Sequence, residues 1–187
     1  MRAALLTCVL LVGLNQETGA KDRDVHTQSA VRRLVANILS SPSATQTLTA
    51  YCARLHLADP PVIHAVRDRS FDRPAGPDIR RLLKVRAHEA IRYRRVRLSC
   101  GSHVLSDADN WYVPARLTAE MNTRLERTDT PFGTVVKALD FRRHALGQQR
   151  LHDGRHVLQV RALLLNRDGQ PFSLVRENYS AVLVGHR

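Results

Sequence analysis

The first third of the chain carries a hydrophobic pattern typical of two short helices. Five aliphatic residues between positions 31 and 39 recur at i, i+3, i+4, i+7 and i+8, which places them on one helical face. Ser40-Ser41-Pro42 ends this helix, and Ser43 can cap a second one, with Gln46 completing a capping box. The resulting helical hairpin either only packs on a core or also covers a pocket. The second helix of this hairpin is expected to bury one face, which contains Leu48, Tyr51, Cys52 and Leu55.

The rest of the chain alternates strand patterns with turns and short helices. Asp78 and Thr118 are expected to cap two of these helices, and residues 134–141 form a short helix or a strand. The segment between His144 and His156 is polar and short, and residues 152–156 are expected to be a loop. Strands linked mostly by short turns, with helices inserted between them, predict an α+β domain with an antiparallel sheet. The expected strands are 62–66, 91–100, 104–113, 155–166 and 172–184.

Residues 1–20 have the features of a secretory signal peptide. Met1-Arg2 is a short positive start, an apolar run follows to Leu14, and Thr18-Gly19-Ala20 offers small residues before Lys21. Residues 21–187 then form a single domain in the periplasm or outside the cell. The alternative is that residues 1–20 are an ordinary buried helix or strand of a cytoplasmic protein. The apolar run is too short to span a membrane, so we expect no integral membrane segment.

The state of the cysteines depends on the cellular compartment in which the protein resides. Removing residues 1–20 takes away Cys8 and leaves Cys52 and Cys100. In an oxidising compartment these two thiols can form one disulfide. The alternative is two separate buried thiols, because free cysteine is among the most buried residue types.

Charge narrows the choice of partner. The chain has 187 residues, with 29 Lys and Arg against 17 Asp and Glu, and a formal net charge of +12. Such a balance favours anionic partners. The arginines are spread along the chain without a long basic block, and no zinc finger, aromatic ribonucleoprotein motif or basic zipper is visible. We therefore expect a small acid as ligand and no nucleic-acid partner. We also expect a monomer.

Glu177 is the most informative acidic residue. It shares its parity on the last expected strand with Val175 and Tyr179, so its carboxylate is expected on the buried face. A buried carboxylate is costly unless it is paired or bound to a ligand. The alternative is a register error or an edge position that leaves Glu177 in solvent.

Arg95 is the matching basic residue. An inward guanidinium can hold a carboxylate through two parallel hydrogen bonds. Periodicity does not decide which face of strand 91–100 is inward, and the alternative role of Arg95 is an internal salt bridge with Glu177 or another acid. The other three arginines of this strand, Arg92, Arg94 and Arg97, are expected in solvent.

No cofactor or metal is expected. The chain lacks a nucleophile elbow, a phosphate loop and a dinucleotide fingerprint. His152 and His156 lie four residues apart, but Gly154 and the polar surroundings indicate a loop.

Four segments, taken together, resemble chorismate–pyruvate lyases. They are residues 91–100, Trp111-Tyr112-Val113-Pro114, Thr130-Pro131-Phe132-Gly133 and Arg176-Glu177-Asn178-Tyr179, in the order found in that family, and the resemblance covers residues 30–185. It implies a single antiparallel sheet of about six strands covered by helices, with an enclosed pocket. The same fold serves as the effector-binding domain of some bacterial transcription regulators.

The resemblance also implies roles for individual residues. The lyases split chorismate into 4-hydroxybenzoate and pyruvate without a cofactor. The arginine that binds the ring carboxylate corresponds to Arg95, and the glutamate that contacts the ring hydroxyl corresponds to Glu177. Backbone amides near Ala44 and Phe132 help to hold the acid. Arg95 and Glu177 are thus the expected catalytic residues, with Glu177 orienting the hydroxyl or helping to remove a proton.

Two functions remain open. One is a chorismate–pyruvate lyase. The other is an exported, non-catalytic binding protein for a small aromatic or carboxylic acid, because the lyases act in the cytosol where chorismate is made.

Overall fold

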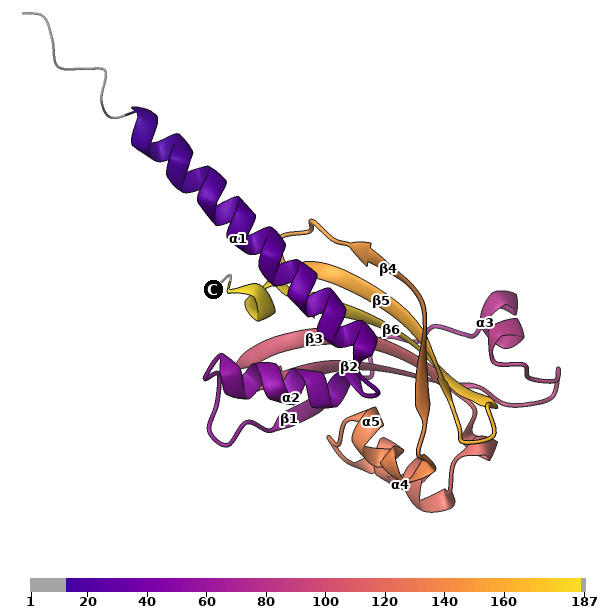
Figure 1. Cartoon of the computed structure of the whole chain (residues 1–187). Helices are drawn as coiled ribbons and strands as arrows, with labels where there is room; N and C mark the ends of the chain where they lie inside the picture. The colour runs from indigo at the N-terminus through magenta and orange to yellow at the C-terminus, as the bar shows by residue number, and fades with distance from the viewer. Residues whose placement is uncertain (1–12, 186–187) are drawn as a thin grey trace, which may run out of the picture.

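Six strands form one antiparallel sheet in the order β1-β2-β3-β6-β5-β4 (Figure 1). The computed structural model describes residues 13–185, with side chains from residue 25 onward. The expected signal peptide therefore lies mostly outside the described residues, and positions 13–20 are the first turns of α1. The helices are α1 (Gly13–Ser40), α2 (Ala44–Arg54), α3 (Pro77–Leu82), α4 (Ala119–Arg127) and α5 (Phe132–Val135). The strands are β1 (Ile63–Asp68), β2 (Arg92–Cys100), β3 (His103–Tyr112), β4 (Arg142–Arg150), β5 (His156–Leu165) and β6 (Pro171–Ser180).

Short 3-10 helices lie near three turns, at Pro114–Arg116, Lys137–Leu139 and Ala181–Val184. Within the described range, no helix is long and apolar enough to cross a membrane. The α+β class with a single six-stranded antiparallel sheet, expected from the sequence, is confirmed.

The two faces of the sheet are covered by different elements. Leu34, Ile38 and Leu48 of α1 and α2 pack on the strands together with Val96 and Leu98, and we call this side the helical face. Helices α4 and α5 extend the cover over the other end of the same face through a second apolar cluster. On the opposite face, the segment around α3 covers part of the sheet. That cluster contains Leu83, Trp111, Val113, Leu163 and Leu174.

Strand β4 corrects the sequence prediction. No strand was expected in the polar segment between His144 and His156, but Arg142–Arg150 is a nine-residue strand paired antiparallel with β5. The strand lies at the edge of the sheet, and all of its residues except Arg143 are exposed. An exposed edge strand needs no alternation of apolar residues, so periodicity could not reveal it.

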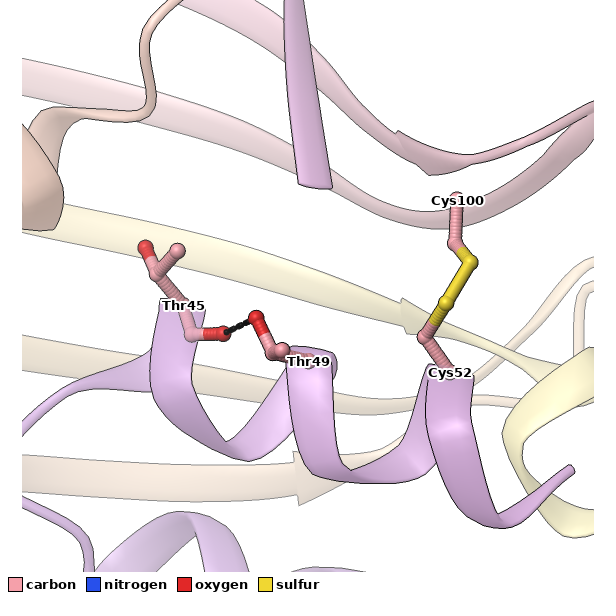
Figure 2. The surroundings of a disulfide bond; sticks show 4 residues. All are labelled: Thr45, Thr49, Cys52 and Cys100. Atoms are coloured by element: carbon pink, nitrogen blue, oxygen red, sulfur yellow. Dashed lines mark hydrogen bonds between the residues drawn. A yellow bond between two sulfur atoms is a disulfide. The ribbon is translucent and has the colours of Figure 1, made fainter. Parts of the chain in front are cut away.

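A disulfide joins Cys52 near the end of α2 to Cys100 at the end of β2 (Figure 2). Both residues are fully buried in the cluster beneath α1 and α2, and they are separated by 48 residues in sequence. The bond therefore fixes α2 covalently to the sheet.

Replacing both cysteines with alanine is expected to lower the free energy of unfolding by about 2–4 kcal/mol, because the unfolded chain loses the constraint of a long closed loop. Urea unfolding of the double variant, compared with the oxidised and the reduced parent protein, measures this effect. The reduced parent should be destabilised similarly to the variant. An unfolding midpoint that is the same with and without reductant would show that the two thiols are not bonded.

Candidate functional site

A buried chamber lies between the helical face of the sheet and the start of α2. Its cavity volume is about 50 Å³. Strands β2, β3, β5 and β6 form an apolar wall, and the start of α2 together with α5 closes it on the outside. Its ionisable wall residues are Arg94, Arg143 and Glu177, and the remaining lining includes Ala44, Val96, Leu98, Ala108, Asn110, Phe132, Leu164 and Val175.

Arg94 brings an uncompensated positive charge to the chamber. Its side chain is on the helical face of β2 and the residue is only 2% exposed. Its Nη2 donates a 3.4 Å hydrogen bond to the Thr130 carbonyl, while Nε and Nη1 have no partner among the described residues. Burial, helped by repulsion from Arg67, lowers the pKa of Arg94 to about 10. The chamber therefore favours a bound anion beside this group.

Asn110 adds another unpartnered donor next to Arg94. The antiparallel register sets Arg94 of β2 directly opposite Asn110 of β3, so their side chains are neighbours on the same face. Asn110 Oδ1 accepts a 2.5 Å hydrogen bond from Ser173 Oγ, while Asn110 Nδ2 has no partner within the described residues. Three buried nitrogen atoms of two adjacent side chains thus lack an acceptor.

The second guanidinium of the chamber is already neutralised. Arg143 Nη2 donates a 2.5 Å hydrogen bond to Glu177 Oε2, and its Nη1 donates to the Ile38 carbonyl at 3.2 Å. Tyr179 Oη donates to the same Glu177 oxygen at 2.9 Å. Burial lowers the pKa of Arg143, but the Glu177 carboxylate and Tyr179 together outweigh it, so the net pKa is raised. Burial and the Glu177 charge raise the pKa of Tyr179 well above its usual value.

Three of the four expected site positions meet in this chamber. Ala44, Phe132 and Glu177 all line it, and the expected burial of Glu177 is confirmed by an exposure of 6%. Ala44 is the first residue of α2, and Phe132 is the first residue of α5. The resemblance had implied that these two positions face one ligand.

Arg95 lies on the opposite face of the sheet, so the expectation that it meets Glu177 in one cavity is wrong. Its guanidinium is 3.6 Å from Asp109 and 3.8 Å from Asp68, and it stacks over the ring of Phe71. The reason is the alternation of β2, which turns Arg94 and Val96 inward and Arg95 outward.

Sequence reasoning missed Arg94, Asn110 and Arg143. Arg94 was expected in solvent, although it shares its parity with Val96, Leu98 and Cys100, and that signal was present in the sequence. Arg143 lies on the strand that carried no periodic signal. For Asn110, nothing in the local pattern indicated a free amide.

His156 is held between two carboxylate groups. His156 Nε2 lies 2.9 Å from Asp107 and its Nδ1 lies 2.9 Å from Asp153, which ties the loop before β5 to β3. Among the side chains described, from residue 25 to residue 185, no three His, Cys, Asp or Glu residues are grouped as a metal ion would need.

Solved structures share this fold. PhnF from Mycobacterium smegmatis superposes with a TM-score of 0.55 at 11% identity, over 76% of this chain and 65% of PhnF. The isolated effector domain of PhnF gives a TM-score of 0.52 at 12% identity, over 74% of this chain and 88% of that domain. The chain therefore has the effector-domain fold, which is the chorismate-lyase-like fold expected from the sequence.

Sequence comparison identifies a relative. No family model matches the chain. The uncharacterized protein y4mC of Sinorhizobium fredii (strain NBRC 101917 / NGR234) is 39% identical over 198 residues, which cover 94% of this chain and 84% of that protein. At this identity and coverage, the chain belongs to the family of protein y4mC.

Proposed function

We propose that this protein binds a small carboxylic acid in the chamber beneath α2 and α5. The observation that carries the proposal is Arg94, a buried guanidinium with two unpartnered nitrogen atoms beside the unpartnered amide of Asn110. An unpaired buried charge costs several kcal/mol, and a ligand carboxylate offsets this cost. Hydrogen bonds between a guanidinium and a carboxylate are also among the strongest that proteins make.

The charges of the chamber favour a ligand with one negative charge in it. Arg143 and Glu177 form a buried ion pair and neutralise each other, so Arg94 leaves a single positive charge. A monocarboxylate balances that charge. A second negative charge in the same apolar space would lack a partner.

The size of the chamber limits what it encloses. A cavity that takes a benzene ring measures about 150 Å³. The chamber, at about 50 Å³, holds a carboxylate group and a few carbon atoms. This favours a short or extended acid over an aromatic ring held inside.

Acetate tests the proposal, with the neutral acetamide as a matched control of nearly the same shape. Acetate is expected to raise the melting temperature and to give a saturable calorimetric titration, because it supplies the charge that Arg94 needs. Acetamide should do neither at the same concentration. If acetate and acetamide gave equal shifts and titrations, or if neither acetate nor propionate bound, the proposal would be wrong.

A second candidate function is the chorismate–pyruvate lyase reaction. It is favoured by the meeting of Ala44, Phe132 and the buried Glu177 in one chamber, as the resemblance implied. Incubation with chorismate and detection of 4-hydroxybenzoate tests it, and folded protein that leaves chorismate unchanged rejects it. The disulfide favours the binding role, since disulfides persist in oxidising compartments and chorismate is made in the cytosol.

A further inference from the structure

A second, larger cavity adjoins the chamber. This vestibule has a volume of about 350 Å³ and lies on the outer side of the start of α2. It shares five wall residues with the chamber, so the two spaces lie next to each other, and we call this shared wall the mouth. The shared residues are Pro42, Ser43, Thr45, Gly133 and Phe141.

The mouth is narrow because α5 approaches α2 closely there. A side chain added at Gly133 would bring its Cβ to 3.1 Å from Ser43 Oγ and to 3.2 Å from Thr45 Oγ1. The absence of a side chain at Gly133 thus lets α5 pack directly against both hydroxyl groups.

The vestibule wall is rich in hydrogen-bonding groups. Thr45 and Thr49 lie on successive turns of α2, and Figure 2 shows the hydroxyl of Thr49 bonded to the Thr45 carbonyl, at 3.0 Å. Beyond the mouth, the wall is completed by the polar side chains of Gln46, Thr49, Thr134, Lys137 and Asp140. Asp140 is paired with Arg167 at 3.3 Å, so its charge is partly balanced.

We propose that the natural ligand is a hydroxylated carboxylic acid of the sugar-acid class, with its carboxylate in the chamber and its hydroxylated tail in the vestibule. This inference rests on the proposed function and extends it to the second cavity. The chamber encloses only the acid head, and the vestibule offers hydroxyl and amide groups that both donate and accept hydrogen bonds. The disulfide at the other end of α2 holds this wall in place, which reduces the cost of ordering it on binding.

Four acids distinguish the chemistry of the tail. Gluconate, hexanoate and adipate each have six carbons, and acetate represents the head alone. Gluconate is expected to bind at least about tenfold more tightly than acetate and than hexanoate, because its hydroxyl groups pair with the vestibule wall. Isothermal titration of the oxidised full chain measures all four affinities.

Paired variants locate the effect. Thr49→Val together with Thr134→Val, at two positions that line the vestibule and not the chamber, keeps the shape of both side chains and removes their hydroxyl groups. This double variant is expected to lose about tenfold in affinity for gluconate and to keep the parent affinity for acetate. Thr123→Val is the matched control, because Thr123 is exposed on α4 and its hydroxyl donates to the Ala119 carbonyl, as that of Thr49 does to Thr45.

Each outcome separates the two proposals. If acetate binds and gluconate binds no better, the inference on the tail is wrong while the carboxylate site stands. If adipate binds most tightly, Lys137 selects a second carboxylate and the hydroxylated class is again wrong. If no acid binds, the proposed function itself fails.

Discussion

Replacing Arg94 with methionine is expected to abolish binding of small carboxylates and, at the same time, to stabilise the unliganded protein. The guanidinium is buried and forms no salt bridge within residues 25–185, so it is costly in the empty chamber and is neutralised when an acid binds. Loss of a buried charge partner costs about 2–5 kcal/mol of binding, which corresponds to at least about 30-fold in affinity.

The gain in stability follows from the same burial. Methionine fills a similar volume without a charge to desolvate, so the free energy of unfolding is expected to rise by about 1–4 kcal/mol. Urea unfolding without ligand and calorimetric titration with acetate measure the two effects on the same sample.

The neighbouring residue provides the control. Arg95 lies one position further along β2 but on the opposite face, where it pairs with the partly exposed Asp68 and with the buried Asp109, which Arg176 also binds. Arg95→Met is expected to leave acetate binding unchanged and to alter stability by about 1 kcal/mol or less. If Arg95→Met lost binding and Arg94→Met kept it, the assignment of the anion site would be reversed.

Breaking the ion pair between Arg143 and Glu177 is expected to be the most destabilising change in the site. Arg143→Met leaves the Glu177 carboxylate buried with only the Tyr179 hydroxyl as partner. Glu177→Leu leaves the buried Arg143 guanidinium without an acid, bonded only to the Ile38 carbonyl. Each single change should lower the free energy of unfolding by about 3–5 kcal/mol, because an unpaired charge remains in the apolar interior.

The double variant tests the cause. Combining Arg143→Met with Glu177→Leu removes both charges, so it should be clearly more stable than either single variant. The exposed pair of Arg92 and Glu126 is the comparison, where Arg92→Met should cost about 1 kcal/mol or less. If the double variant lost as much free energy of unfolding as the two single variants together, Arg143 and Glu177 would not be a coupled buried pair.

Much of the fold follows from local pattern. Local signals identified several helices and strands that the structure contains. They are the two apolar helical faces before residue 56, the N-cap at Thr118 and the apolar alternation of the central strands. These signals are readable because each element buries one face, and burial imposes a period of 3.6 or 2 on the sequence. The same parity argument placed Glu177 on the buried face.

The sequence by itself determined the α+β class, a sheet beneath a helical hairpin, and a carboxylate directed inward from the last strand. Only the tertiary structure decided which arginine meets that carboxylate. Arg94 and Arg95 differ by one position, and the packing of α1 and α2 on one face selects between them. Arg143 comes from an exposed edge strand that carries no hydrophobic period, so its contact with Glu177 depends on pairing across 34 residues. Long-range strand pairing, which leaves no local trace in a polar segment, therefore completed the chamber.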